Sequence, residues 1–283
     1  MTRISPLTVG LLQFDVKKGN LTANMEAVSA AAKDAQARGV DWLILPELFS
    51  SSYDLENAAR WGAINKAEVL PELSRLAGDH RLHIAGSLML PLPSGGIGNT
   101  LVWIDDTGRK AGCYTKLHRF RPMNEDRYLT PGDTPALVAT PFGKVGLSIC
   151  YDLRFPELYR HYQAQGARFA ILPSQWPNPR LKHFRTLTIA RAIENQMVML
   201  AVNRVGAEDG NTFPGHSMVV DPWGEIICDA RDEEILLTCM FDPAEITKVR
   251  KDFPVVDDIR HEMWERINHG KTQHKTKPHD PYL

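Results

Sequence analysis

Short apolar runs alternate with helical segments along most of this 283-residue chain, and this alternation limits the choice of fold more than any other feature. The clearest helical segment runs from Leu21 to Arg38, where Leu21, Met25 and Val28 fall on one side and Gly39 follows as a stop signal. Further helices are expected at 67–77, 156–165 and 181–195, and strands at 8–14, 42–45, 84–88, 101–104, 110–114, 144–149, 169–172 and 198–202, with more strands between 216 and 241. Strands and helices in this order predict an α/β fold.

Nothing in the sequence marks a boundary between two domains, because residues 1–257 contain no internal repeat and no linker-like segment. A single α/β domain commonly exceeds about 200 residues. The hydrophobic content of 43% and the charged content of 24% are ordinary for a globular protein. Residues 258–283 differ, because their last part, 268–283, holds many histidines and lysines and little to bury, so we expect a mobile, solvated tail there.

Charge and cysteine usage limit the partners and the compartment. A formal net charge of −1 gives no electrostatic reason for binding nucleic acid or a membrane, and no apolar run approaches the roughly 18 residues of a transmembrane helix. The four cysteines form no C-x-x-C pair, so no metal or redox motif is indicated, and we expect Cys113, Cys228 and Cys239 to pack in the core. This usage, and an N-terminus without a signal-peptide layout, predict a reducing cytoplasm.

Cys150 stands where the expected strand 144–149 gives way to a turn and then to a helix that begins near Pro156. Side chains on such turns project from the sheet, and free backbone N–H groups gather beside them. A free cysteine is more often a small buried hydrophobe, so its position alone leaves that interpretation open. A thiol is only about 3% ionised at pH 7, so a nucleophilic cysteine needs a base or a cation nearby.

Two further polar residues follow expected strands. Glu47 comes just after 42–45 among apolar neighbours, and desolvation there would raise its pKa toward the range of a general base. Lys116 comes just after 110–114, and its ammonium could lower the pKa of a thiol and stabilise an oxyanion. Most glutamate and lysine side chains lie on the protein surface. However, open α/β sheets build their sites at strand ends, so we predict that Glu47, Lys116 and Cys150 form one site.

Glu47 in PELF, Lys116 in YTKLH and Cys150 in ICYDLRFPE resemble the Glu-Lys-Cys triad of the nitrilase superfamily, the carbon–nitrogen hydrolases. The segments 191–196 and 216–225 also resemble that superfamily. The resemblance implies a four-layer αββα sandwich, with two sheets face to face and helices outside. It implies an enzyme without a metal or an organic cofactor, and a homodimer in which residues 258–283 dock at the interface.

The residues after the nucleophile place the resemblance in the amidase branch that includes the omega-amidases. In that branch the cysteine is followed by Tyr-Asp-x-Arg-Phe, as at 151–155, whereas true nitrilases have Trp-Glu there. The implied reaction is hydrolysis of a small carboxamide, such as the 2-oxo ω-amide 2-oxoglutaramate, through a thioester on Cys150. Glu47 would move the protons, and Lys116 with the backbone N–H of Tyr151 would hold the oxyanion. Glu125 is similar to a second family glutamate, which orients the lysine or the substrate, although the neighbouring Asp126 could take its place.

An ω-amide that ends in a carboxylate needs a cationic or hydrogen-bonding anchor. The candidates lie near expected strand ends or in the loops that follow, and for each a structural role is equally open: Tyr53, His118, Trp176, Arg180, His183 and Arg204. Two arginines have a glutamate three residues later, and we expect them to form structural pairs: Arg154 with Glu157, and Arg191 with Glu194.

Several other functions stay open on the sequence alone. The same superfamily includes amidases for deaminated glutathione, aliphatic amidases, N-carbamoyl hydrolases and nitrilases. A thioester on Cys150 could also be passed to an amine, which would make the protein an acyltransferase. A partner-binding protein that kept the fold is the non-catalytic alternative, although it would have no need for Glu47, Lys116 and Cys150 together.

Overall fold

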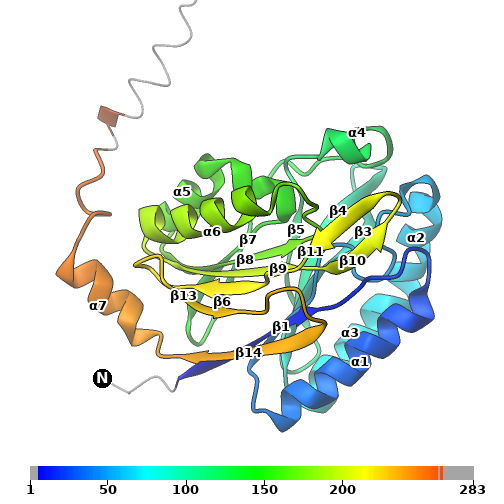
Figure 1. Ribbon diagram of the computed structural model, residues 1–283, viewed down its shortest axis with the longest axis horizontal. Coiled ribbons are helices and arrows are strands. Elements are labelled where there is room, and N and C mark those ends of the chain that lie inside the picture. The colour runs from blue at the N-terminus through cyan, green and yellow to red at the C-terminus, as the bar shows by residue number, and fades with distance from the viewer. Residues whose placement is uncertain (1–5, 261, 264–283) are drawn as a thin grey trace, which may run out of the picture.

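The computed structural model describes residues 6–260 and 262–263, and it consists of two six-stranded sheets packed face to face with helices outside (Figure 1). The predicted four-layer αββα sandwich is confirmed. The expected tail at 258–283, with its docking at a dimer interface, lies largely outside the described residues.

The first sheet is built from both ends of the chain. Its order is β14 (Ile235–Phe241), β1 (Leu7–Gln13), β2 (Trp42–Ile44), β3 (His83–Pro91), β4 (Ile97–Ile104) and β5 (Lys110–Thr115). The pairs β1–β2 and β2–β3 are parallel, and the remaining pairs are antiparallel. Helices α1 (Leu21–Ala37) and α3 (Leu70–His80) cover its outer face.

The second sheet repeats this plan with the middle of the chain. Its order is β13 (Ile226–Asp229), β12 (Met218–Val220), β9 (Val198–Asn203), β8 (Ala167–Ser174), β7 (Gly143–Leu147) and β6 (Leu137–Thr140). The pairs β7–β8 and β8–β9 are parallel. Helices α5 (Pro156–Ala164) and α6 (Leu181–Asn195) cover its outer face (Figure 1).

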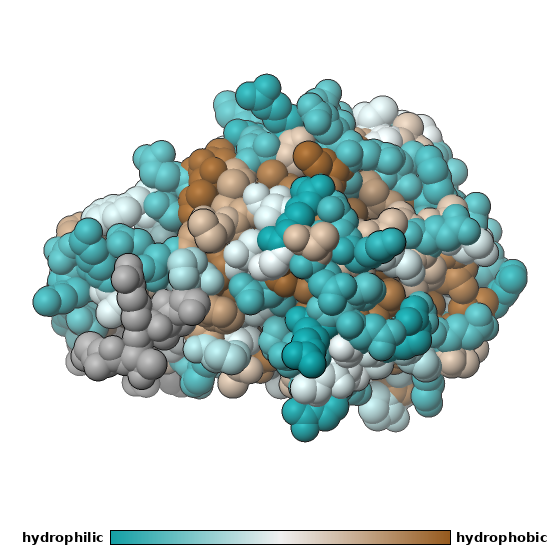
Figure 2. Space-filling model, turned by 90° about the horizontal axis from the view of Figure 1, so that it is seen from below, coloured by the Kyte–Doolittle hydropathy of each residue, from teal (hydrophilic) through white to brown (hydrophobic). Residues whose placement is uncertain are grey.

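Shorter elements complete the structure. They are η1 (Leu55–Asn57), α2 (Ala58–Ile64), η2 (Asn65–Val69), η3 (Arg121–Met123), α4 (Glu125–Tyr128), η4 (Cys150–Arg154), the hairpin β10 (Val205–Glu208)–β11 (Asn211–Pro214), and α7 (Ala244–Asp252). No helix among the described residues is both long and apolar enough to span a membrane. The face in Figure 2 is mostly hydrophilic, with its apolar residues in small separate groups.

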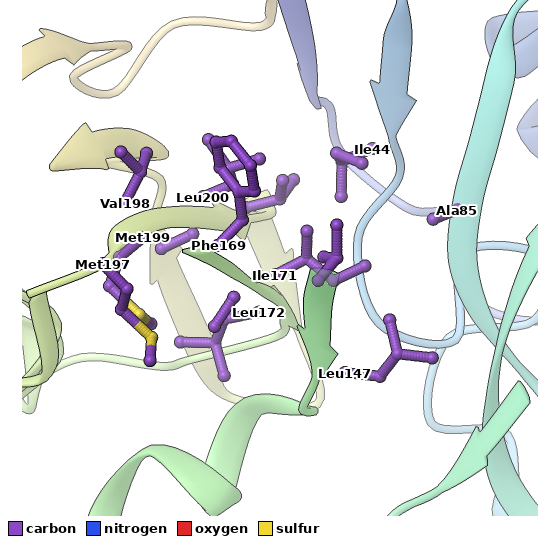
Figure 3. Close-up of a cluster of buried hydrophobic side chains, with 14 of the residues drawn as sticks. Ile44, Ala85, Leu147, Phe169, Ile171, Leu172, Met197, Val198, Met199 and Leu200 are labelled. Atoms are coloured by element: carbon purple, nitrogen blue, oxygen red, sulfur yellow. The ribbon is translucent and has the colours of Figure 1, made fainter. Parts of the chain in front are cut away.

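The alternation of side chains along β2 shows why the sheets stack. Trp42 and Ile44 point into the core between the sheets, whereas Leu43 packs on the side of α1 and α3. The ring of Trp42 meets the ring of Phe169 edge to face, with centroids 5.2 Å apart, across the gap between the sheets. Figure 3 shows the same cluster, in which Ile44 of the first sheet and Ile171 of the second both take part.

Most predicted elements occur close to their predicted bounds. The helix at 181–195 is matched in full, whereas the helix expected at 67–77 is the end of a longer helical region that starts at residue 58. Strand β6 and the hairpin β10–β11 have no counterpart in the prediction, because their apolar runs are too short to stand out. The prediction that Cys113 is a core residue is wrong: it lies on an exposed face of the edge strand β5.

Candidate active site

Glu47, Lys116 and Cys150 meet at one end of the sandwich. Glu47 follows β2, Lys116 follows β5, and Cys150 follows β7 and begins η4. The Nζ atom of Lys116 lies 2.7 Å from Oε1 of Glu47, and the same carboxylate lies near enough to Cys150 to raise the pKa of its thiol. All three side chains are buried, with exposed fractions of 0% for Glu47, 1% for Lys116 and 4% for Cys150.

Glu125, at the start of α4, completes a buried cluster of charges. Its Oε1 accepts hydrogen bonds from Nζ of Lys116 at 2.8 Å and from the hydroxyl of Tyr53 at 3.0 Å. Its Oε2 accepts from the backbone N–H of Phe120 at 2.6 Å. The neighbouring Asp126 is exposed, so the second carboxylate beside the lysine is that of Glu125.

Burial and charge set the resting protonation states. Burial lowers the pKa of Lys116, but the carboxylates of Glu125 and Glu47 more than reverse this, so its pKa is raised and the ammonium persists. Burial raises the pKa of Glu47 against the opposing effect of Lys116. Burial also raises the pKa of the Cys150 thiol, and Glu47 raises it further. The Cys150 thiol is therefore neutral at rest, and it can become a thiolate only as its proton passes to a base.

Glu47 is held from several sides. The amide Nδ2 of Asn99 donates to Oε1 at 2.8 Å, and the backbone N–H of Gln175 donates to Oε2 at 2.9 Å. The Gln175 side chain donates to the backbone oxygen of Glu47 at 2.7 Å. Gln175 is itself fixed by Arg204, whose guanidinium donates to its Oε1 at 2.9 Å. Such contacts fix the carboxylate in a single orientation.

The backbone at Cys150 is strained, and Asp152 supports it. Cys150 has φ of +45°, a left-handed conformation that costs a non-glycine residue about 1–2 kcal/mol. The buried Asp152 accepts from the backbone N–H of Ile149 at 3.0 Å and from the Tyr114 hydroxyl at 2.7 Å. It also accepts from the backbone N–H of His118 at 3.1 Å. One carboxylate thus joins the nucleophile turn to the segment that carries Lys116.

The structure separates the candidate substrate residues into two groups. Tyr53 lies in the charge cluster, and Trp176 lies beside Cys150. His118 lies apart: its ring stacks on Phe155 at 3.6 Å, and its Nδ1 lies 2.8 Å from Oδ1 of Asp152. It lines a separate cavity of about 380 Å³ that Cys150 does not reach.

The pocket at Cys150 is lined by two arginines. The guanidinium of Arg154 lies 4.8 Å from the Trp176 ring centroid, and that of Arg180 lies 5.6 Å from the ring of Phe120. Within residues 6–260 and 262–263, neither forms an ion pair. The pocket holds about 10 Å³, room for roughly one water molecule, so it is closed in this conformation.

Three arginine predictions have different outcomes. The pair of Arg191 with Glu194 is confirmed, at 2.9 Å. The predicted pair of Arg154 with Glu157 is wrong, because Arg154 turns toward the pocket and its Nη2 lies 3.3 Å from Nδ1 of His183. Arg204 is buried in ion pairs, which leaves its charge no access to the pocket.

Sequence reasoning missed Asn99, Gln175 and the bridging role of Asp152. Gln175 follows β8 directly, so the strand-end argument that selected Glu47 could have found it. Asn99 lies inside β4, where no local pattern distinguishes it. Among the described residues, no group of three or more His, Cys, Asp or Glu side chains is arranged to hold a metal ion.

Buried Glu, Lys and Cys side chains at the strand ends of an αββα sandwich define a class of enzyme, and comparisons with known proteins agree. Residues 8–251 match the family model described as carbon–nitrogen hydrolase. A carbon–nitrogen hydrolase from Helicobacter pylori G27 has a similar structure, with a TM-score of 0.87, 26% identity, and 93% of this chain and 98% of that chain covered.

This chain belongs to the carbon–nitrogen hydrolase family, and the predicted superfamily is confirmed. It is 34% identical over 257 residues to the 2-oxoglutaramate amidase of Bacillus subtilis (strain 168), covering 91% of this chain and 99% of that one. A mutant amidase from Nesterenkonia sp. AN1, with the acetamide moiety of fluoroacetamide added covalently at its active-site cysteine, matches with a TM-score of 0.81 and 26% identity, over 92% and 96% of the two chains. The protein is a cysteine-dependent amidase of this family.

Proposed function

We propose that the protein hydrolyses a small carboxamide that carries a carboxylate at its other end, specifically a 2-oxo ω-amide such as 2-oxoglutaramate. The observation that carries this substrate class is the pair of guanidinium groups, Arg154 and Arg180, that line the nucleophile pocket without an acidic partner among the described residues. An anionic substrate would supply the missing negative charge. The activity of the Bacillus subtilis relative supports the particular amide.

The proposed chemistry starts with the neutral thiol. The sulfur of Cys150 attacks the amide carbonyl while Glu47 takes the thiol proton, so the thiolate is never free in the buried site. The carbonyl oxygen becomes an oxyanion, which the ammonium of Lys116 and the backbone N–H of Tyr151 stabilise. Glu47 then returns the proton to the departing ammonia, and the C–N bond breaks to leave a thioester on Cys150.

The second half of the reaction reuses the same base. Glu47 takes a proton from a water molecule as that water attacks the thioester carbonyl. The resulting intermediate collapses, the sulfur leaves, and the proton returns to it, which regenerates the thiol and releases the acid. Glu125 keeps Lys116 charged and in place throughout, because its Oε1 lies 2.8 Å from the ammonium.

The test is ammonia release from a panel of 2-oxoglutaramate, 2-oxosuccinamate, deaminated glutathione, a plain aliphatic amide, an N-carbamoyl amino acid and a nitrile. We expect the fastest release from the 2-oxo ω-amides and none from them with Cys150→Ala. Equal rates for the plain amide and the 2-oxo ω-amides would contradict the carboxylate anchor. Product that appears only when an amine acceptor is added would identify acyl transfer instead.

We also propose a cytoplasmic homodimer. Cys150 works only as a thiol, and a reducing compartment keeps it so. Ile193, Trp223 and Phe253 are 48%, 54% and 56% exposed, and the rings of Trp223 and Phe253 stack 6.2 Å apart. An apolar group of this kind at the surface is typical of an interface. Light scattering should give the dimer mass for the wild type and a lower mass for Ile193→Asp, and a wild-type monomer would contradict the proposal.

A further inference from the structure

We propose that Asn99 is a positioning residue that makes Oε2 of Glu47, rather than Oε1, the atom that receives the thiol proton. The inference rests on the proposed function, because it concerns the base of that reaction. It deepens the function by assigning the base to one atom and by naming the side chain that selects it. Asn99 touches no reacting atom of the substrate in this scheme and acts through Glu47 alone.

The two oxygens of Glu47 differ in their hydrogen bonds. Oε1 accepts from Nδ2 of Asn99 at 2.8 Å and from Nζ of Lys116 at 2.7 Å. Within the part of the chain that the structure describes, Oε2 accepts one hydrogen bond, from the backbone N–H of Gln175 at 2.9 Å. A carboxylate oxygen offers about two acceptor sites, so Oε1 is filled while Oε2 keeps one site open. The Cys150 thiol is a close neighbour of this carboxylate, and each group affects the pKa of the other.

Asn99 itself provides a second, independent observation. It lies inside β4 with only 2% of its surface exposed, and its Oδ1 has no hydrogen-bond partner among the described residues. An unpaired buried oxygen is unfavourable, and buried polar atoms without a partner are uncommon. If the side chain only filled space in this strand, an apolar residue would serve better, because it has no polar atom to leave unpaired. The amide is explained by its other half, the N–H group aimed at Glu47.

The link between Asn99 and Lys116 strengthens the selection. The backbone oxygen of Asn99 accepts from the backbone N–H of Lys116 at 2.9 Å. The two donors to Oε1 are therefore held by neighbouring backbone segments of β4 and the end of β5, and they approach the carboxylate as one unit. Substitution of the Asn99 side chain leaves this backbone bond in place, which isolates the effect of the amide.

The expected consequence is a change in the basicity of Glu47. The titratable groups around it are Lys116, Glu125, Cys150 and Tyr53. A hydrogen bond from Asn99 favours the ionised carboxylate, so its loss raises the pKa of Glu47. Asn99→Asp keeps the shape of the side chain but replaces the N–H donor with a carboxylate oxygen. Asn99→Leu removes the donor without adding charge. In both variants the pH below which activity falls, the acid limb of the pH profile, should move upward. The shift should be larger in Asn99→Asp.

The experiment measures the rate of Cys150 alkylation by iodoacetamide against pH, with the Cys150 peptide followed by mass spectrometry so that the exposed Cys113 does not interfere. This readout needs no substrate, and it is paired with kcat/KM against pH for 2-oxoglutaramate. We expect both Asn99 variants to shift the acid limb of both profiles upward and to lower kcat about 10- to 100-fold, with KM nearly unchanged.

Asn195→Asp is the matched control. Asn195 is also a buried asparagine whose Oδ1 has no partner among residues 6–260 and 262–263 and whose amide lies near a glutamate, but it is at the end of α6, away from Glu47. Its profiles should coincide with the wild type even where its melting temperature falls. If both Asn99 variants keep the wild-type pH limbs and lose only melting temperature, the inference is overturned. A wild type that is alkylated normally but releases no ammonia contradicts the proposed function instead.

Discussion

The two sheets contribute unlike halves of the active site. The first sheet and its loops supply Glu47, Lys116 and Glu125, three buried charged groups joined by ion pairs of 2.7 and 2.8 Å. The second sheet supplies Cys150, one neutral thiol on a left-handed backbone, and the arginine-lined pocket beside it. The buried ion cluster lies in the first half, and the second half holds Cys150 and the proposed substrate contacts.

Because of this difference, we expect substitutions in the two halves to affect activity and stability differently. A buried ion cluster is costly to break, because removal of one partner leaves the other charges buried and unpaired. A buried thiol without an ion pair can be removed at little cost. Substitutions in the first half should therefore change both the rate and the free energy of unfolding. Substitutions of Cys150 or of the pocket arginines in the second half should change the rate or the substrate affinity alone.

The largest effect on activity is expected from Cys150→Ala. Without the sulfur no thioester forms, so kcat for 2-oxoglutaramate should fall by roughly 10⁴-fold or more. The free energy of unfolding should stay within about 1 kcal/mol of the wild type, since the side chain makes no ion pair. Steady-state kinetics and urea unfolding of the same preparation check both expectations. A large loss of stability would show that the second half is also structural.

Lys116→Met should have the second-largest effect on rate and the largest on stability. The loss of one oxyanion donor costs about 10²- to 10³-fold in kcat. Glu47 and Glu125 would be left buried without their cation, which should lower the free energy of unfolding by about 3–5 kcal/mol. Urea unfolding at pH 7 measures this. If Lys116→Met were as stable as Cys150→Ala, the proposed difference in stability between the two halves would be wrong.

Asp152→Asn tests the bridge between the halves. Asp152 lies in the turn of the second sheet, but it accepts hydrogen bonds from Tyr114 and His118, on either side of Lys116. An amide in its place loses the charge and turns one acceptor into a donor, so we expect kcat to fall about tenfold and stability by about 1–3 kcal/mol. Asp229→Asn, in an ion pair with Arg185 away from the site, is the control for a lost carboxylate. Equal kcat values for the two variants would show that Asp152 does not link the two halves of the site.

The parts of the site that were predictable share one property: a local pattern determines their place. Cys150, Glu47 and Lys116 each follow a strand whose apolar run is visible in the sequence, and strand ends collect at one edge of a sheet. Glu125 came only from family resemblance, because it begins a helix of only four residues that gives no local signal. Asn99 depends on which strands are neighbours, and the alternation of strands and helices does not determine that.

The same limit applies to the fold. Alternation predicts the α/β class, but the division of the strands between two sheets came from the resemblance. Strand β14 pairs with β1 from the opposite end of the chain, with Val9 next to Cys239 in register. Contacts between residues so far apart in sequence leave no periodic trace, because each strand shows only that it is buried and not which strand it meets.

The smallest effect is expected at the pocket wall, and it concerns affinity alone. Arg180→Gln removes one of two half-buried guanidinium groups that have no acidic partner among the described residues, so KM for 2-oxoglutaramate should rise about tenfold while kcat stays within a factor of two or so. KM for a plain aliphatic amide should not change, because that substrate has no carboxylate. Arg160→Gln, an arginine of α5 that bonds the backbone oxygen of Glu194, is the control for loss of one positive charge. A KM that rises equally for both amides would mean that Arg180 shapes the pocket rather than binding an anion, and the substrate contacts would then lie elsewhere in the second half.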